Sequence, residues 1–213
     1  MFALKTSLLT TVQLPILGLY LALNPGSTDA DEAVTLTRIE IDLNPSLDGS
    51  IIDNSPFDGN PDFFSDLPPN GVSLNPGLED SRSVVEFDLN ELPPGAIIRR
   101  AQLRATVIGK AVVSTSIPIE VRAFSSNGVL NLSDFHQGRF EGVADASAIP
   151  INSTIKVDVL PLVTAIHNNS ERKLVAFVLR TSGLGAINFG SLESGPAPLL
   201  KLVVAVPTAP ASP

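Results

Sequence analysis

Cysteine and tryptophan are absent from this chain of 213 residues, and tyrosine occurs once, as Tyr20. Without cysteine the protein can form no disulfide, no thiolate nucleophile and no cysteine-ligated metal centre. Basic residues are also scarce, because 14 Lys and Arg stand against 22 Asp and Glu and leave a net charge of −8. Nucleic acids and anionic membrane surfaces are usually met by basic patches. The charge balance therefore disfavours both as partners.

Alternating apolar and polar residues are the main pattern that the chain does have. In residues 83–107, Val85 and Phe87 alternate with Glu86 and Asp88, and a Pro-Pro-Gly turn precedes a second alternating run. A period of two puts one face of a strand on a core and the other in water. With 44% hydrophobic residues, 15 Gly and 18 Pro, the chain has material for a core and for many turns. The sequence predicts an all-β fold, an antiparallel β-sandwich of jelly-roll type.

Further elements follow from the same reasoning. Residues 173–180 are apolar at nearly every position, which predicts a central strand covered on both faces. Residues 158–167 predict a short helical turn with Asp158 as its N-cap. Residues 44–82 are rich in turn residues and are expected to form a long loop, and residues 129–150 show no regular pattern. The predicted strands are residues 34–43, 83–89, 97–108, 117–124, 155–159, 173–180 and 199–206.

The chain divides into a leader, one domain and a tail. In residues 1–30, Lys5 is the only charged residue before Asp29, and an apolar run and small residues follow it. This pattern is typical of a signal peptide or an uncleaved N-terminal anchor. Residues 31–206 are the expected β-sandwich domain, and residues 207–213 are a Pro-rich tail. We therefore expect an exported protein, either extracellular or at the cell surface.

Several segments match a known pattern. They are VVEFDLNELPPGAIIRRAQLR at 84–104, VDVLPLVTAI at 157–166 with FVLR at 177–180, and NFGSLE at 188–193 with PLLKL at 198–202. Together they resemble the DNRLRE-type, or disaggregatase-related, β-sandwich family of secreted bacterial and archaeal proteins. Some members of that family are treated as carbohydrate-binding modules.

Other segments carry a closer likeness. They are DGSIID at 48–53, FDG at 57–59 and GVLNLSDFHQG at 128–138. In these the chain is similar to exported bacterial proteins that often end in a PEP-CTERM sorting tail. The likeness covers about residues 35–206, without the Trp-containing middle segment of the wider family and without the sorting tail. It implies a secreted sandwich more firmly than it implies a function, because one fold hosts many functions.

Oxygen-bearing side chains recur within the expected long loop. Asp58, Asn60 and Asp62 alternate, a spacing that can supply three oxygen ligands to calcium, and Asp48 lies nearby in sequence. The pattern is not an EF-hand, since Phe63 stands where that loop needs glycine. The alternative is that Asp, Asn, Gly and Pro simply form turns here. Calcium is thus a candidate cofactor, and both interpretations stay open.

Sugar binding is the second candidate, because carbohydrate sites stack sugar rings on exposed aromatics beside hydrogen-bonding side chains. Phe57, Phe63 and Phe64 lie in the expected loop and are the candidate ligand-binding residues. The absence of tryptophan weakens this interpretation. The phenylalanines at strand positions are assigned to the core: Phe87, Phe124, Phe177 and Phe189.

Charged residues at polar strand positions have a structural interpretation. Glu86, Glu120, Arg104 and Arg122 are expected to form cross-strand charge pairs. Glu86 and Asp88 lie two residues apart on one strand, where pairing with arginine is a simpler role than glycoside cleavage. A catalytic function for these carboxylates is therefore not expected.

No catalytic motif occurs in the sequence, whether nucleophile elbow, zinc-binding helix or phosphate loop. His136 is interpreted as a structural loop contact and His167 as a solvated loop residue. We therefore expect a non-catalytic module of the cell surface or extracellular matrix that binds polysaccharide or other surface components. One alternative is a purely structural or adhesive protein without a small ligand. A polysaccharide-active enzyme is a more distant one.

Overall fold

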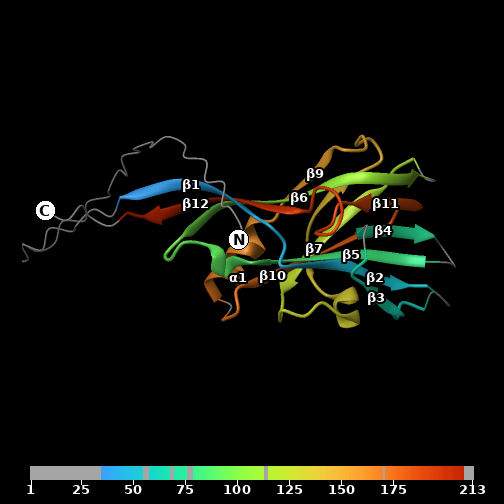
Figure 1. Cartoon of the computed structure of the whole chain (residues 1–213), viewed down its shortest axis with the longest axis horizontal. Coiled ribbons are helices and arrows are strands. Elements are labelled where there is room, and N and C mark those ends of the chain that lie inside the picture. Colours follow the sequence, from blue (N-terminus) through green and yellow to red (C-terminus); the bar gives the residue numbers. More distant parts are fainter. Residues whose placement is uncertain are drawn as a thin grey trace, which may run out of the picture.

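The computed structural model describes residues 35–54, 58–67, 70–75, 79–112, 115–169 and 171–208. These residues form twelve strands, one α-helix and two 3₁₀ helices (Figure 1). The strands are β1 (Leu36–Leu43), β2 (Leu47–Asp53), β3 (Phe63–Ser65), β4 (Asn70–Asn75), β5 (Glu79–Asp88), β6 (Ile97–Val112), β7 (Pro118–Ser125), β8 (Arg139–Asp145), β9 (Thr154–Asp158), β10 (Leu174–Thr181), β11 (Gly185–Phe189) and β12 (Leu199–Pro207). The helices are η1 (Leu89–Glu91), η2 (Leu132–His136) and α1 (Leu160–Asn169). The all-β prediction is confirmed.

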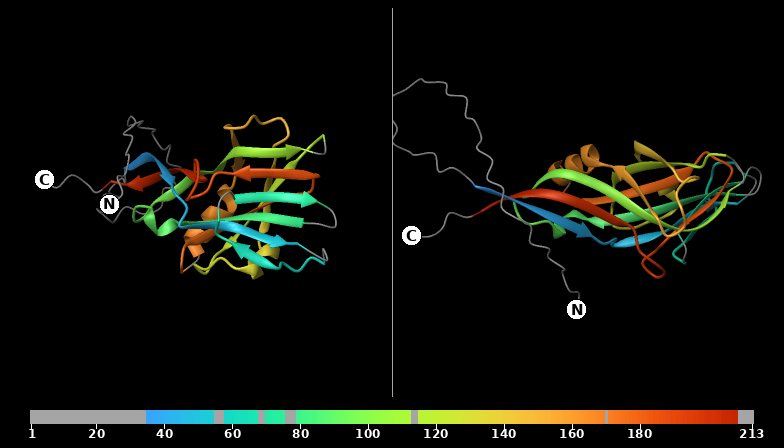
Figure 2. Two further views of the ribbon diagram at one scale, coloured as in Figure 1. Left: turned by 45° about the vertical axis from the view of Figure 1, so that its right-hand side comes forward. Right: turned by 90° about the horizontal axis from the view of Figure 1, so that it is seen from above.

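The strands belong to one antiparallel sheet that curls into two facing layers (Figure 2). Two long strands change partners along their length. β6 pairs with β12 along residues 97–104 and with β11 along residues 107–112. β5 pairs with β4 along residues 79–81 and with β10 along residues 83–88. These changes of partner carry the sheet from one layer to the other, which gives a sandwich of jelly-roll type.

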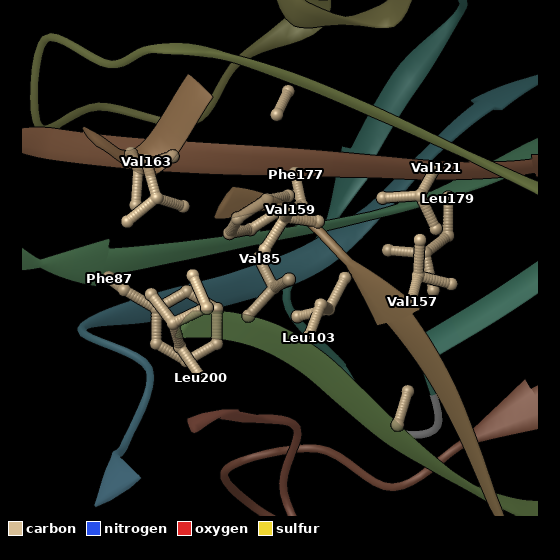
Figure 3. Close-up of a cluster of buried hydrophobic side chains, with 14 of the residues drawn as sticks. Val85, Phe87, Leu103, Val121, Val157, Val159, Val163, Phe177, Leu179 and Leu200 are labelled. Atoms are coloured by element: carbon tan, nitrogen blue, oxygen red, sulfur yellow. The ribbon is translucent and has the colours of Figure 1, made fainter. Parts of the chain in front are cut away.

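The main core fills the space between the two layers (Figure 3). Strand alternation directs Val85, Phe87 and Leu103 inward, as predicted, and each is no more than 2% exposed. Phe87 meets Phe177 edge to face with the ring centroids 5.9 Å apart, a favoured aromatic geometry. Helix α1 adds Val163 to the same cluster. Burial of this apolar set is the main source of stability for the domain.

A second, smaller core lies on the outer face of β5 and β10. Residues 126–138, here called the cover, contain η2 and pack over this face. β10 is therefore buried on both faces, which confirms the prediction for residues 173–180. The second core consists of Ile51, Val84, Leu130, Phe135, Ala176 and Val178, with Phe64 and Phe124 packed against it.

The prediction of a long loop at residues 44–82 is wrong, because this segment holds β2, β3, β4 and the start of β5. Its polar residues fit in strands because tertiary partners satisfy them. The Gly71 N–H donates to Ser50 Oγ at 3.0 Å, and the Gly59 N–H donates to Asp53 Oδ2 at 2.9 Å. Strands β8 and β11 also occupy segments where no strand was expected.

The Pro-Pro-Gly turn joins two strands as predicted, but these strands are not neighbours in the sheet. β5 pairs with β2, β4 and β10, whereas β6 pairs with β12, β11 and β9. The turn, with Gly95 at φ +71°, is therefore a crossing between ladders and not a hairpin. The helical prediction is confirmed, since the Leu160 N–H donates to Asp158 Oδ1 at 3.0 Å where α1 begins.

The leader of residues 1–30 and most of the predicted tail lie outside the described residues. The signal-peptide and anchor interpretations therefore stay predictions. The Thr208 N–H donates to the Thr35 carbonyl at 2.9 Å, so the two ends of the described domain lie side by side. In the described part of the chain, no helix has the length and apolar character needed to cross a membrane.

Candidate functional site

A hollow of about 500 Å³ lies on the outer face of β9, β6 and β12. Strand register sets its floor. Arg104 lies opposite Lys156 on β9 and opposite Leu199 on β12, and Thr106 lies opposite Thr154. Residues directly opposite each other share one face of a sheet. The alternation that buries Leu103, Ala105 and Val107 therefore gathers these even-numbered residues outside.

Ser153, at the end of the loop of residues 146–153, lines one wall of the hollow, and this loop is fixed to β6. The Val107 N–H donates to the Ser153 carbonyl at 2.9 Å, and the Asn152 N–H donates to the Val107 carbonyl at 2.7 Å. Lys110 Nζ donates to two further carbonyls of this loop, at 3.0 and 2.6 Å. These bonds hold the wall in place relative to the floor.

Residues 190–198 form the opposite wall. A Cβ atom on Gly190 would lie 2.2 Å from the Pro196 carbonyl oxygen, so only glycine permits this close approach. The Ser191 N–H also donates to the Ser194 carbonyl at 2.8 Å, which closes the loop on itself. Both walls are therefore built by specific backbone contacts.

Among the residues that the structure describes, the two cations on the floor have no acidic partner. Arg104 Nε donates to Gln102 Oε1 at 2.9 Å, and within the described residues neither Arg104 nor Lys156 belongs to an ion pair. Like charges directly opposite each other destabilise a sheet. In a protein of net charge −8, such a pair marks a place where an anionic ligand would gain stabilisation that the protein itself does not supply.

The hollow combines hydrogen-bonding groups with an apolar strip. Thr106 Oγ1 and Thr154 Oγ1 lie 3.2 Å apart, and Ser153 adds a third hydroxyl. Pro196 and Leu199 supply apolar surface beside them. A sugar presents hydroxyls around an apolar ring face, which matches this lining. No Asp or Glu is among the described residues that line the hollow, so it lacks the carboxylate pair of most glycosidases.

The candidate calcium residues lie in two places, with Asp48 apart from Asp58, Asn60 and Asp62. The Asn60 N–H donates to Asp58 Oδ1 at 2.8 Å, which lowers the pKa of Asp58, and the Asn54 N–H donates to Asp62 Oδ2 at 2.7 Å. Asp48 lies at the other end of β2 and accepts from a backbone N–H of the 190–198 wall at 2.8 Å. Among the described residues, no three His, Asp or Glu side chains are placed to hold a metal ion. Calcium binding stays a prediction without a supporting ligand cluster.

The three candidate phenylalanines have different environments. Phe64 packs against the second core, and its ring lies so close to Gly49 that a Cβ there would be 2.5 Å from the ring. Phe63 is 41% exposed, whereas Phe57 lies outside the described residues. Phe64 is thus a packing residue, and Phe63 keeps a ring available to a ligand. Phe140 on β8 is 53% exposed and was not among the predicted ligand-binding residues.

Cross-strand charge pairing is confirmed for one of the four residues proposed for it. Glu120 pairs with Arg180 at 2.6 Å. Arg122 Nε instead donates to a backbone carbonyl of the cover at 3.0 Å, and Arg104 faces the hollow. The prediction is wrong for Arg104 because the residue opposite it is another cation, Lys156.

Glu86 is buried and not exposed to water, because the cover lies over its face of β5. Hydroxyls of Ser46 and Ser126 donate to its two carboxylate oxygens. Asp134 of η2 is also buried, and this burial raises the pKa of its carboxyl group. The Asn131 N–H bond opposes that rise in pKa, and the charge of Glu86 adds to it. This cluster is a buried part of the fold, separate from the open hollow.

Both histidines contact backbone carbonyls. His136 Nε2 lies 2.7 Å from the Gly59 carbonyl oxygen, which confirms its predicted loop contact. His167 lies on α1 with Nε2 at 3.1 Å from the Ala96 carbonyl oxygen. The solvated-loop prediction for His167 is wrong because the helix continues to Asn169.

The comparisons with known proteins show no matching family and a weak structural likeness. No family model and no curated protein matches the chain. A cryo-EM structure of Mud crab tombus-like virus has 11% sequence identity and a TM-score of 0.33, covering 97% of this chain and 96% of that one. A likeness at this level carries no argument about function. The functional argument therefore depends on the hollow itself.

Proposed function

We propose that this protein is an exported, non-catalytic module of the cell surface or extracellular matrix that binds polysaccharide in the hollow over β9, β6 and β12. The observation that carries the proposal is that Arg104 and Lys156, opposite each other beside the hydroxyls of Thr106 and Thr154, form no ion pair within the described residues. An open hollow of about 500 Å³ with fixed walls has the size of a ligand site. The resemblance to secreted carbohydrate-binding sandwiches agrees with this assignment.

The two cations favour a polymer that carries carboxylate or sulfate groups. The terminal nitrogens of Arg104 have no partner within the described residues. A guanidinium group binds carboxylates and similar anions in a bidentate, charge-assisted geometry. Lys156 adds a second positive charge one strand away. Sugar hydroxyls next to the anionic group would meet the threonine hydroxyls.

The structural or adhesive alternative is favoured by faces on which all charges are paired. The Glu120–Arg180 and Glu40–Lys201 pairs, at 2.6 and 2.9 Å, are of that kind. Arg104 and Lys156 in the hollow form no ion pair within the described residues, so we place binding above a purely structural role. An enzyme ranks lower, because the lining of the hollow lacks paired carboxylates.

Three polymers with one backbone test the proposal: dextran, carboxymethyl dextran and dextran sulfate. Each is added to the full-length ¹⁵N-labelled protein while amide resonances are followed by NMR. We expect a charged dextran to shift the resonances of Thr106, Ser153 and Thr154. The proposal fails if none of the three polymers shifts them, or if the shifts centre on another face of the domain.

A double variant without the two positive charges supplies the second arm of the test. Arg104→Gln with Lys156→Gln replaces both cations with a shorter, neutral polar side chain. It should weaken binding of the charged dextran by about tenfold or more, since each charge-assisted bond contributes about 1.5–3 kcal/mol. Arg139→Gln on β8 is the matched control, because Arg139 is exposed and does not line the hollow. Equal affinity of the double variant and the wild type would overturn the assignment.

A further inference from the structure

The free edge of β1 is a surface that the proposed function does not use. β1 pairs with β12 along one edge, and its other edge pairs with no strand of the described chain. Figure 1 shows β1 and β12 extending from the body of the domain. An unpaired edge of eight residues presents backbone N–H and C=O groups that can template another strand.

β1 lacks two of the features that commonly block such an edge, a proline and a β-bulge. Its sequence, LTRIEIDL, contains no proline and no glycine, and its register with β12 runs without a shift. Its even-numbered residues Arg38, Glu40 and Asp42 are exposed on the outer face. Ile39 and Ile41 pack inward against the main core. A partner strand must therefore match one charged and one apolar face.

We propose that β1 pairs antiparallel with β1 of a second copy of this chain, with Arg38 of each copy opposite Glu40 of the other. The two faces match only in registers that place even-numbered residues opposite even-numbered ones. The register centred on Ile39 creates two Arg38–Glu40 contacts and one Ile39–Ile39 contact. Charge complementarity and apolar contact then coincide in one alignment.

The other registers that keep the faces matched and bring charged residues of the two copies opposite each other all include a like-charge contact. Centring on Arg38 places two arginines opposite each other. Centring on Glu40 creates two Arg38–Asp42 contacts but also places two glutamates opposite each other. Centring on Ile41 places Glu40 opposite Asp42. Like charges directly opposite each other are destabilising. The register centred on Ile39 is favoured because it makes opposite-charge contacts without a like-charge contact.

The charged residues are free to make these contacts. Arg38 belongs to no salt bridge within the described residues. Glu40 bonds to Lys201 of its own chain at 2.9 Å but keeps 48% of its side chain exposed. Its carboxylate can therefore accept from an arginine of the partner while the internal bond is kept.

Charge exchange on the full-length chain tests the pairing by sedimentation velocity over a concentration series. We expect the wild type to dimerise, and Arg38→Glu or Glu40→Arg alone to weaken the dimer by about tenfold or more, because each places like charges in contact at two symmetric positions. The double variant exchanges both charges and should restore dimerisation. A wild type that is monomeric at every concentration, or a double variant no better than the single ones, overturns the proposal.

A disulfide test fixes the register independently. The native chain has no cysteine, so Ile39→Cys introduces a single thiol that lies opposite its symmetry mate and should cross-link on oxidation. Ile41→Cys is the matched control, because in this register the two thiols are four residues apart along the strands, about 13 Å. Cross-linking of the control as readily as Ile39→Cys would refute the register. Circular dichroism confirms that each variant is folded.

Discussion

Replacing Phe135 with alanine measures how firmly the cover belongs to the folded domain. Phe135 is 1% exposed, the Arg82 guanidinium carbon lies 3.5 Å from the centroid of its ring, and Arg82 Nη1 donates to the Phe135 carbonyl. Alanine would leave a cavity beneath the cover and remove the cation–π contact. Phenylalanine-to-alanine changes in cores cost about 3–5 kcal/mol. We expect the free energy of unfolding to fall by about 4 kcal/mol.

The assay is urea unfolding followed by far-ultraviolet circular dichroism, because the chain has no tryptophan. At about 2–4 °C per kcal/mol for a domain of this size, Tm should fall by about 8–16 °C. Phe140→Ala is the matched control: Phe140 is 53% exposed, and its loss should change stability by about 0.5 kcal/mol or less. If the two variants lose equal stability, the cover is not part of the core and the second-core interpretation is refuted.

Three further predictions concern single residues. Hydrogen bonds from Ser147 lower the pKa of Asp145 to about 2, so the stability it contributes is present above the ordinary pKa of about 3.9 and is lost as pH falls toward 2, which NMR titration and acid unfolding would show. Gly190→Ala should displace the Pro196 wall, cost about 1–3 kcal/mol and weaken polymer binding, measurable by thermal melt and titration. Burial raises the pKa of the Asp134 carboxyl group, so the stability that this group contributes is present below its ordinary pKa of about 3.9 and is lost as pH rises through the raised pKa. Asp134→Asn should reduce that loss of stability in thermal melts across pH.

The strands with clean alternation could be predicted from the sequence. Residues 101–107 alternate, and β6 occupies them because one face meets the core and the other meets solvent. Residues 174–179 are apolar throughout, and β10 lies there because the main core and the cover bury its two faces. In these segments local pattern and tertiary burial agree, which is why the pattern predicts them.

The strands of residues 44–82 could not be predicted, because their stability comes from distant partners. Ser50 and Asp53 read as turn residues, yet hydrogen bonds to Gly71 and Gly59 let them lie in β2. Strand propensity depends on such packing and pairing more than on the residue itself. The same dependence explains Glu86: strand alternation predicted an exposed side chain, but the cover buries it.

The hollow could not be predicted because it depends on register. Arg104 and Lys156 are 52 residues apart in sequence and meet only through the β6–β9 pairing. Each alone is an ordinary charged residue at an outward strand position. The Gly190–Pro196 contact that builds one wall is likewise invisible in a local pattern. The aromatic and acidic residues that predicted a site lie within residues 48–66, whereas the two cations of the hollow lie on another part of the sheet.

The proposed dimer and the proposed site are linked by the same sheet. Asp42 of β1 lies opposite Lys201, which lies opposite Gln102, and Gln102 shares its face of β6 with Arg104. Pairing of two β1 edges about a twofold axis perpendicular to the sheet would therefore place both hollows on one continuous face. One polymer chain could then engage two sites, and such bivalence raises avidity by about 10²–10⁴ without any new contact. Arg38→Glu should then weaken binding of a long polymer far more than binding of a short oligosaccharide, whereas equal losses for both would mean that the two sites act alone.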